Sequence, residues 1–370
     1  MKIVFIPNLP YTYRDHKRFG AEYFINKGYD VEVMDIHNVL IPGYKEKVDI
    51  EYFKFENHWE PKSEEDILQR VKELTKYDFI FFYIAGYDAI KLLKKMKDNS
   101  QASFITYVGG SIPTTTVHCT FFNYLKTQIK NFIKNFIPKY RLKFHTDYYV
   151  SGAPNDEIIF SNLITKRTKI IKSNSRDYNL CLKSNLYKNE NKYCVFLDTD
   201  VIDASDYVLF GSDAIKDVET YLKKLVKFFK WIQKEYKLDV IIAAHPKSRI
   251  YKNKNELEGF KIIHGKSAEL VHGSEFVINE GTTAISYAIF FNKPLIFFTF
   301  KEINFFNHHL CSFTKELKKE AMDIDNIDKY KFDKELQNAN RYQYYKNNYL
   351  TYEDLKIDTF EMLEKEIFKI

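Results

Sequence analysis

Short apolar runs alternate with amphipathic stretches along the first half of the chain. A continuous apolar run is typical of a strand that is buried on both faces of a sheet. The stretch Asp15–Lys27 has the periodicity of a helix and stops at Gly28, a residue type that commonly follows a helix end. The predicted strands of this half are 2–7, 30–34, 79–85 and 103–108, and the stretch 147–151 closes it. Their order predicts a parallel, doubly wound sheet.

The same alternation starts again at Tyr193 and continues through the second half. The predicted strands there are 193–197, 239–244, 260–264, 276–279 and 294–299, and the predicted helices are 218–235, 267–272 and 283–292. The sequence therefore predicts an α/β protein with two Rossmann-like, doubly wound parallel-sheet domains that face a central cleft.

A polar segment between the two halves sets the expected domain boundaries. It is rich in Asn, Lys and Ser and has little continuous apolar character. We expect a first domain over 1–170, a connection over 171–192 and a second domain over 193–345. The tail 346–370 has helical periodicity, and we expect it to pack back on the first domain.

Composition indicates a folded protein and narrows the function classes. Of the 370 residues, 45% are hydrophobic and 29% are charged, which is close to ordinary globular usage. The 56 basic and 50 acidic residues give a net charge of +6, which suits an anionic substrate or membrane surface. Because nucleic-acid binders usually carry denser basic patches, we expect no nucleic-acid partner.

The sequence shows no targeting segment and no metal-binding pattern. No apolar stretch reaches the roughly 20 residues that a membrane-spanning helix needs, and the chain enters directly as a strand. We therefore expect a cytoplasmic protein. The 4 cysteines form no C-x-x-C pair, which argues against both a zinc site and a disulfide framework.

The predicted strand 239–244 runs directly into a basic segment. His245, Pro246, Lys247 and Arg249 follow it and place an imidazole, an ammonium and a guanidinium at a strand's carboxyl end. Ligands of open parallel sheets bind beyond the carboxyl ends of the strands. These side chains are therefore candidates for binding a phosphate.

A second candidate phosphate site is the turn Glu280-Gly281-Thr282-Thr283, where a predicted strand passes through Gly into a helix. A helix N-terminus offers unpaired N–H groups and the positive end of a dipole, and the Thr282 and Thr283 hydroxyls add donors. Thr at a helix start is also a common N-cap, so this turn has a purely structural interpretation as well.

The segment 193–299 resembles the nucleotide-binding half of GT-B glycosyltransferases. The resemblance rests on the strand ending in His-Pro, the Gly-Thr-Thr turn and the Lys-Pro-Leu-Ile-Phe-Phe strand. More narrowly, the segment looks like the GT-B enzymes that use CMP-activated acidic sugars, namely the bacterial sialyltransferases and Kdo transferases. The resemblance implies that His245 contacts the donor phosphate and protonates it as it leaves. It also implies that Thr282 and Thr283 hold that phosphate, and that no metal or other cofactor is needed.

The chain departs from that family at the general base. The family pattern includes a carboxylate pair followed by Gly, and no such triplet stands here. An inverting transfer needs a carboxylate or an imidazole to accept the proton of the acceptor hydroxyl. Asp15 in the first half is the preferred candidate because the donor is expected on the second half. The other candidates are Asp88, Asp198 and Asp200.

The triplet Asp198-Thr199-Asp200 allows another interpretation. GT-A glycosyltransferases also end an apolar strand in D-x-D, and there the carboxylates bind a divalent cation that bridges to a nucleotide diphosphate. In this sequence the triplet opens a separately wound second domain, which argues against that role. It can equally be a turn-capping loop, or it can orient the donor in the cleft.

Residues 121–143 form a basic amphipathic stretch. Apolar side chains fall on one helical face of 121–137, and lysines line its flank. Such a helix can lie on anionic lipid headgroups, which would place the protein at the inner membrane and suggest a lipid-linked glycan acceptor. It can also be an ordinary helix that covers the sheet, with its lysines extending to the border.

These observations predict an inverting glycosyltransferase of bacterial surface-glycan assembly. The donor would be a CMP-activated acidic sugar, such as a nonulosonate or Kdo, and the acceptor an oligosaccharide or a lipid-linked glycan. The alternatives are a CDP-alditol phosphotransferase and a UDP- or GDP-sugar glycosyltransferase. An alternative of another class is a non-catalytic, sugar-nucleotide-binding subunit of an assembly complex.

Overall fold

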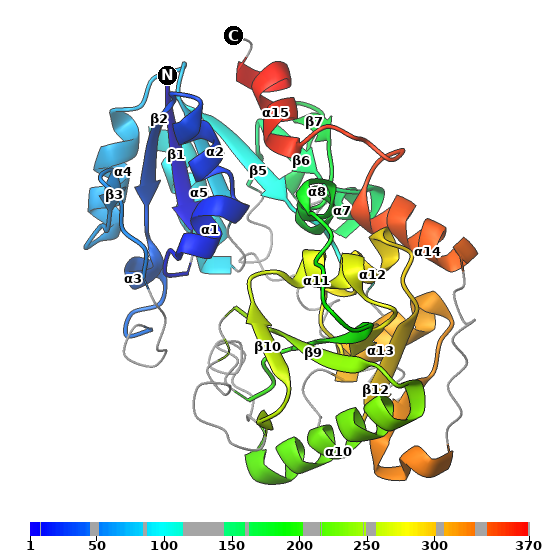
Figure 1. The fold of residues 1–370 in the computed structure, drawn as a ribbon. Coiled ribbons are helices and arrows are strands. Elements are labelled where there is room, and N and C mark those ends of the chain that lie inside the picture. Colours follow the sequence, from blue (N-terminus) through cyan, green and yellow to red (C-terminus); the bar gives the residue numbers. More distant parts are fainter. Residues whose placement is uncertain are drawn as a thin grey trace, which may run out of the picture. The chain divides into compact units, whose positions relative to one another are not determined.

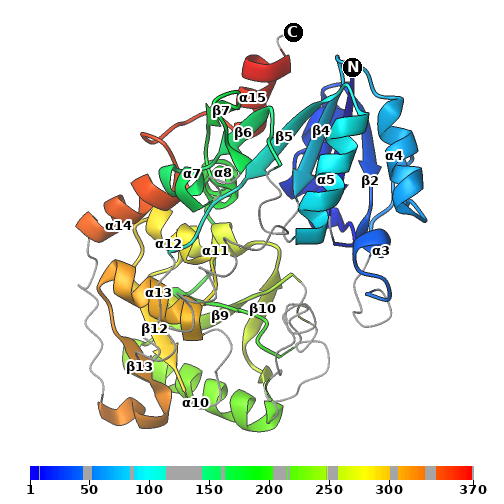
Figure 2. The same ribbon diagram turned by 180° about the vertical axis from the view of Figure 1, so that it is seen from behind.

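The computed structural model divides the chain into two compact units. The first comprises 1–111, 118–176 and 351–370, and the second comprises 112–117 and 177–350. Each unit is a parallel sheet with helices on both faces (Figures 1 and 2). The structure describes residues 1–7, 9–44, 52–83, 87–113, 144–159, 163–202, 215, 217–246, 248, 257–300, 307–329 and 339–368.

The sheet of the first unit has the order β3-β2-β1-β4-β5-β6-β7, and every pair in it is parallel. Its strands are β1 (Lys2–Pro7), β2 (Asp30–Met34), β3 (His58–Trp59), β4 (Phe79–Tyr83), β5 (Ser103–Val108), β6 (Tyr148–Ser151) and β7 (Lys169–Lys172). Its helices are α1 (Tyr13–Arg18), α2 (Ala21–Asn26), α3 (His37–Leu40), α4 (Glu64–Lys72), α5 (Tyr87–Asn99), α7 (Pro154–Ile159) and α15 (Thr359–Leu363), which continues as a π-helical turn, Glu364–Phe368.

Both faces of this sheet carry a hydrophobic core, because successive side chains of a strand point to opposite faces. Ile3 and Phe5 of β1 lie in one core, together with Phe24 of α2. Val4 and Ile6 lie in the other core, which helix α4 also covers. This two-sided burial explains why the strand sequences are continuous apolar runs.

The second unit repeats the same winding with the order β10-β9-β8-β11-β12-β13, again all parallel. Its strands are β8 (Tyr193–Leu197), β9 (Asp239–Ala244), β10 (Lys261–His264), β11 (Val277–Asn279), β12 (Leu295–Thr299) and β13 (Ala321–Asp323). Its helices are α8 (Arg176–Lys183), α10 (Val218–Tyr236), α11 (Ser267–Gly273), α12 (Ile285–Phe290), α13 (Asn307–Leu317) and α14 (Ala339–Tyr345), with a 3₁₀ segment, Ile324–Lys329, and a π-helical turn, Lys346–Leu350.

The C-terminal tail belongs to the first unit from Thr351 onward. Helix α15 lies beside β6 and β7 (Figures 1 and 2), and Phe360, Leu363 and Phe368 are buried in the core that contains Phe24. A buried Asn174 fastens the tail: its Nδ2 donates to the carbonyls of Leu355 at 3.1 Å and Ile357 at 2.9 Å. Its Oδ1 accepts the Thr351 hydroxyl at 2.5 Å.

The predicted α/β class with two Rossmann-like parallel sheets is confirmed. The facing of the two sheets across a cleft stays a prediction. The units divide after residues 176 and 350, whereas we expected a connection over 171–192 and a tail from 346. The expected connection contains the whole of α8, because Tyr178 and Cys181 supply an apolar stripe within its polar sequence.

The predicted helix Asp15–Lys27 is two helices rather than one. Gly20 has φ +93°, a left-handed conformation that interrupts the helix between α1 and α2. A Cβ at this position would lie 2.6 Å from the ring of Phe360, so the glycine also makes room for the tail. The space that this glycine leaves is used by a residue 340 positions away in the sequence, a contact that local periodicity does not register.

We predict that Asn174→Ala destabilises the first unit by about 2–4 kcal/mol, because it leaves buried carbonyls and a buried hydroxyl without their partner. The matched control is Asn99→Ala, which removes an exposed amide from the same unit and should change stability by no more than about 0.5 kcal/mol. Urea unfolding measures both. Equal effects of the two substitutions would contradict the role given to Asn174.

Candidate active site

A cluster of ionisable side chains lies at the carboxyl ends of three neighbouring strands in the second unit. Asp198 and Asp200 follow β8, His245 follows β9, and Glu280 follows β11. The chain winds outward in opposite directions from β8 and β11, so these two strands flank the topological switch point of the sheet. That point is where doubly wound sheets bind their ligands.

Asp198 ties two of these strand ends together. Its Oδ2 accepts the main-chain N–H of His245 at 2.8 Å, and its Oδ1 accepts the main-chain N–H of Asp200 at 2.9 Å. Burial raises the pKa of Asp198, while the two N–H groups act in the opposite direction. One carboxyl group thus positions the backbone of both the segment after β8 and the segment after β9.

The imidazole of His245 is paired with Asp200. His245 Nδ1 lies 3.4 Å from Asp200 Oδ2, and the histidine side chain remains 26% exposed. The Asp200 carboxylate is buried and accepts no hydrogen bond from the residues that the structure describes. A buried carboxylate is stabilised by a basic neighbour, and the imidazole of His245 is the group that this arrangement places beside it.

Asp200 also has an unusual backbone conformation. Its φ is +60°, in the left-handed region that non-glycine residues seldom adopt and that Asp tolerates better than most. The conformation follows from the hydrogen bond between Asp200 N and Asp198 Oδ1. It turns the chain sharply after β8.

Glu280 directly follows β11 and has no exposed surface. The hydroxyl of Tyr221 on α10 donates to both of its carboxyl oxygens, each at 3.2 Å. Burial raises the pKa of Glu280 to about 8, and the negative charge of Asp198 adds to the effect. Glu280 is thus a neutral acid near pH 7. We expected it at the phosphate site, and that role stays a prediction.

Two further residues of the cluster are not apparent from the sequence. Tyr221 has the spacing of an ordinary core residue on the amphipathic helix α10, and only the tertiary structure places its hydroxyl on Glu280. Ser248 is buried, and its main-chain N–H donates to the His245 carbonyl at 2.9 Å to close a turn. Asp198, Asp200, Tyr221 and Ser248 line one small cavity.

The Gly-Thr-Thr turn follows β11 in the same sheet. Helix α12 begins at Ile285, two residues later than predicted, and its N-cap is Ala284 rather than a threonine. Thr282 is half-buried and Thr283 is exposed. Gly281 has φ +125°, and its N–H donates to the buried Asn279 side chain at 2.6 Å. That the two threonines hold a phosphate stays a prediction.

Asp15 lies in the first unit and caps helix α1. Its carboxylate accepts the Thr12 hydroxyl at 2.6 Å and the Thr12 N–H at 3.3 Å, while its own N–H donates to the Thr12 hydroxyl. This reciprocal capping box gives Asp15 a structural role. Its proposed role as general base stays a prediction.

The other predicted residues are only partly described. Pro246 is exposed at the turn after His245. Lys247, Arg249 and the stretch 121–143 lie outside the described residues, as does the side chain of Asp88.

Within the described ranges, no three His, Cys, Asp or Glu side chains are placed to hold a metal ion. Metal independence itself stays a prediction. In the same ranges, no helix is long and apolar enough to span a membrane.

Comparison with known proteins informs the fold. No protein-family model matches the sequence, and no curated protein matches it. A solved UDP-N-acetylglucosamine 2-epimerase superposes over 100% of this chain and 95% of its own, with a TM-score of 0.50 and 11% identity. The protein has the two-unit GT-B fold.

Two further solved structures align with lower scores. A variant of the wall teichoic acid polymerase TagF covers 94% of this chain and 84% of its own, with a TM-score of 0.48 and 13% identity. Acinetobacter baumannii MurG covers 88% and 86%, with a TM-score of 0.42 and 9% identity. At these identities, structural likeness is informative about fold, while the chemistry has to be argued from the site.

We predict that Glu280 makes stability fall as pH rises. The folded protein keeps the Glu280 proton up to about pH 8, whereas an unfolded chain loses it near the ordinary pKa of 4.5. Since the folded state binds more protons in that window, the free energy of unfolding decreases with rising pH, by at most about 1.4 kcal/mol per unit.

Glu280→Gln keeps an acceptor for Tyr221 and should remove this part of the pH dependence. Glu275→Gln, an exposed change just before β11, is the matched control and should leave the slope unaltered. Chemical unfolding at intervals from pH 5 to pH 8 gives the slopes. A Glu280→Gln slope equal to that of the unsubstituted protein would refute the assignment.

Proposed function

We propose that this protein is a glycosyltransferase that moves a sugar from a nucleotide donor to a glycan acceptor, with the donor phosphate at His245. The proposal is carried by one observation, the buried carboxylate of Asp200 beside the partly exposed imidazole of His245. The pair lies at the carboxyl ends of β8 and β9, and β8 borders the switch point of a Rossmann-like sheet, where this fold places phosphates.

The pair suits the departure of a phosphate. When the glycosidic C–O bond to the donor phosphate breaks, negative charge develops on the leaving oxygen. With Nδ1 turned toward Asp200, the Nε2 edge of the ring is the edge that can meet that oxygen. An imidazolium there stabilises the charge and can donate its proton, and Asp200 stabilises the cation until the proton leaves. Asp198 keeps the ring in place through the backbone.

The donor in this proposal is a CMP-activated acidic sugar. This finer assignment rests on the resemblance of the His245-Pro246 and Gly281-Thr282-Thr283 segments to enzymes of that kind. A CMP donor carries a single phosphate, which the Thr282 and Thr283 hydroxyls and His245 could bind without a bridging cation. In this scheme the reaction needs no metal.

The fold is also compatible with a reaction that uses no acceptor. The solved structure that superposes over the whole chain is by its name a UDP-N-acetylglucosamine 2-epimerase, an enzyme that acts on a nucleotide sugar. The two reactions differ in product. A transferase forms a new glycan and a free nucleotide, while an epimerase returns an isomeric sugar without needing a glycan.

We predict that His245→Ala lowers kcat about 100- to 10,000-fold, the contribution typical of general acid catalysis, with a smaller change in KM. The matched control is His264→Ala, which removes an exposed histidine at the end of a neighbouring strand and should leave turnover unaltered. Product formation from CMP-nonulosonate or CMP-Kdo with glycan acceptors gives the rates. Near-normal turnover of the His245 variant would remove the proposed role.

We predict that CMP raises the melting temperature of the purified protein and that EDTA does not change the shift. A ligand that binds only the folded state stabilises it by about 2.7 kcal/mol at a concentration 100-fold above its Kd. CDP, UDP and GDP, each with and without EDTA, are the comparisons. Stabilisation by a diphosphate and only with metal would overturn the CMP assignment and favour a D-x-D role for Asp198 and Asp200.

A further inference from the structure

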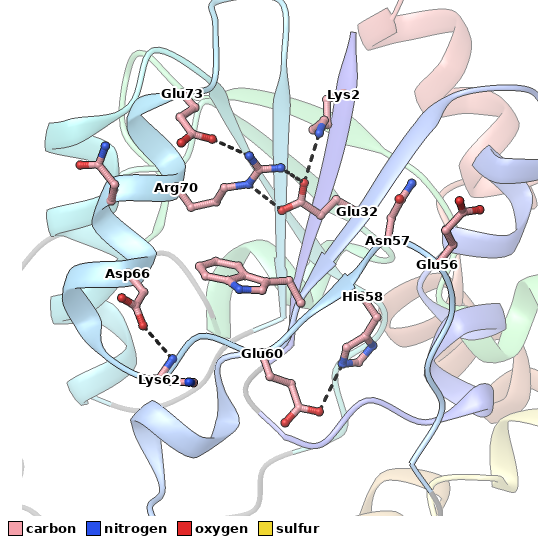
Figure 3. A pocket seen from close by; sticks show the side chains of 12 residues that line it. Lys2, Glu32, Glu56, Asn57, His58, Glu60, Lys62, Asp66, Arg70 and Glu73 are labelled. Carbon is pink, nitrogen blue, oxygen red and sulfur yellow. Dashed lines mark hydrogen bonds and ion pairs between the residues drawn. The ribbon is translucent and has the colours of Figure 1, made fainter.

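A groove of about 670 Å³ opens on the first unit, between helix α4 and the short edge strand β3 (Figure 3). That volume is within the range of small-ligand sites. None of the residues that the sequence analysis selected lines it. The lining residues are Lys2, Glu32, Glu56, Asn57, His58, Trp59, Glu60, Lys62, Asp66, Gln69, Arg70 and Glu73.

The ionic groups at one end of the groove are bound to one another. Glu32 is held between Arg70 and Lys2 (Figure 3): Arg70 Nε donates to it at 3.0 Å and Lys2 Nζ at 3.2 Å, and Arg70 also contacts Glu73. Burial acts to raise the pKa of Glu32, but the two cations outweigh it and lower that pKa below its usual value. Arg70 and Lys2 are thus occupied, and this end offers no strong anion site.

The carboxylates at the other end are also engaged. Glu60 lies 3.0 Å from Lys54 Nζ and 3.7 Å from His58 Nε2. Asp66 accepts the main-chain N–H groups of Lys62 at 2.9 Å and Ser63 at 3.1 Å. Most of the acidic character of the groove is therefore compensated inside the protein, so the groove favours neither a phosphate nor a strongly cationic ligand.

Trp59 supplies an aromatic surface in this groove. It is half-buried against the core that contains Met34 and Ile67. Among the described residues its indole makes no hydrogen bond and no ring contact. The second tryptophan, Trp231 on α10, stacks on Phe228 with ring centres 6.3 Å apart and contacts Tyr236 as well. An indole in a groove without a ring partner can stack on a ligand.

Neutral polar groups surround this indole. Gln69 and Asn57 are exposed and carry amide donors and acceptors, and the Asn57 Nδ2 is fixed by the Val31 carbonyl at 3.2 Å. The exposed side chains of Glu56 and Lys62 have opposite charges. A pyranose matches this set, because its C–H face can stack on an indole while its hydroxyls reach amides and carboxylates.

We propose that this groove binds a neutral oligosaccharide, a part of the glycan acceptor. The assignment of the bound sugar as acceptor rests on the proposed function, while the binding itself does not. Trp59 is the stacking surface, and Gln69, Asn57 and Glu56 hydrogen-bond the hydroxyls. The ion pair of Arg70 with Glu32 of β2 holds helix α4 against the sheet beside the groove.

The two tryptophans make a direct test possible. In the full-length Trp231→Phe protein, Trp59 is the one remaining indole. Its fluorescence is titrated with neutral tetrasaccharides of glucose, galactose and N-acetylglucosamine. We expect a saturable change with at least one of them, and no competition by CMP. No saturable change with any member of the panel would overturn the proposal.

Variants then locate the binding, measured by calorimetry on the saccharide that binds. Trp59→Ala should weaken it about tenfold or more, and Trp59→Phe, which keeps a stacking ring, should lose no more than about threefold. Gln69→Ala should weaken binding, whereas Gln101→Ala, an exposed amide of the same unit outside the groove, should not. Equal affinities of the Trp59→Ala and Trp231→Phe proteins would overturn the assignment.

Charged probes separate the other possible occupants. Tetralysine or a sulfated tetrasaccharide that binds the groove more tightly than any neutral sugar would overturn the proposal in favour of a cationic or an anionic partner. The result is independent of the proposed function. If a saccharide binds but no nucleotide stabilises the protein, the proposal for the groove stands and the proposed transferase function is rejected. If a nucleotide stabilises the protein but no saccharide binds, the proposal for the groove is rejected and the proposed transferase function stands.

Discussion

The carboxyl group of Asp198 determines the geometry of the candidate active site. Each of its oxygens accepts one main-chain N–H, from Asp200 after β8 and from His245 after β9. Parallel strands are linked by long crossovers, so their carboxyl ends have no direct covalent relation. A side chain that accepts N–H groups from two such ends fixes them with respect to each other. The facing of His245 and Asp200 depends on this bridge.

The same bridge explains the electrostatics of the cluster. It brings Asp198 close enough to Glu280 for the charge of one to raise the pKa of the other. Three buried carboxyl groups cannot all be ionised in a poorly solvated space without counter-charges. The proton kept by Glu280 reduces that negative charge. Burial by the helices that cover β8 and β11 maintains this condition, since solvent would relax the pKa values.

The sequence was sufficient to predict most of the fold. Strands β1, β2, β5, β8 and β9 have the predicted bounds, because a strand buried on both faces needs a continuous apolar run. Strand β3 has only two residues and lies at the sheet edge, so it leaves no such signal. The break at Gly20 and the late start of α12 depend on tertiary contacts and local hydrogen bonds, which periodicity does not encode.

The site was only partly predictable for a related reason. His245 and Asp198 follow strands of the predicted sheet, and this position alone indicates functional residues. Tyr221 and Trp59 have sequence contexts identical to those of core aromatic residues, and only their surroundings distinguish them. Tyr221 meets a buried acid, and Trp59 lacks a ring partner among the described residues.

The groove of the first unit and the ionisable cluster of the second unit differ in how their charges are compensated. This difference indicates which chemistry each of them suits. In the groove, Glu32 and Glu60 are each paired with basic side chains, so the surface is close to neutral and suited to hydrogen bonding. In the cluster of the second unit, the basic side chain that the described residues place beside the buried Asp200 carboxylate is His245, which is partly exposed to a ligand. A compensated surface binds a ligand without altering protonation. A cluster whose balance depends on one transferable proton can take part in a reaction that consumes it.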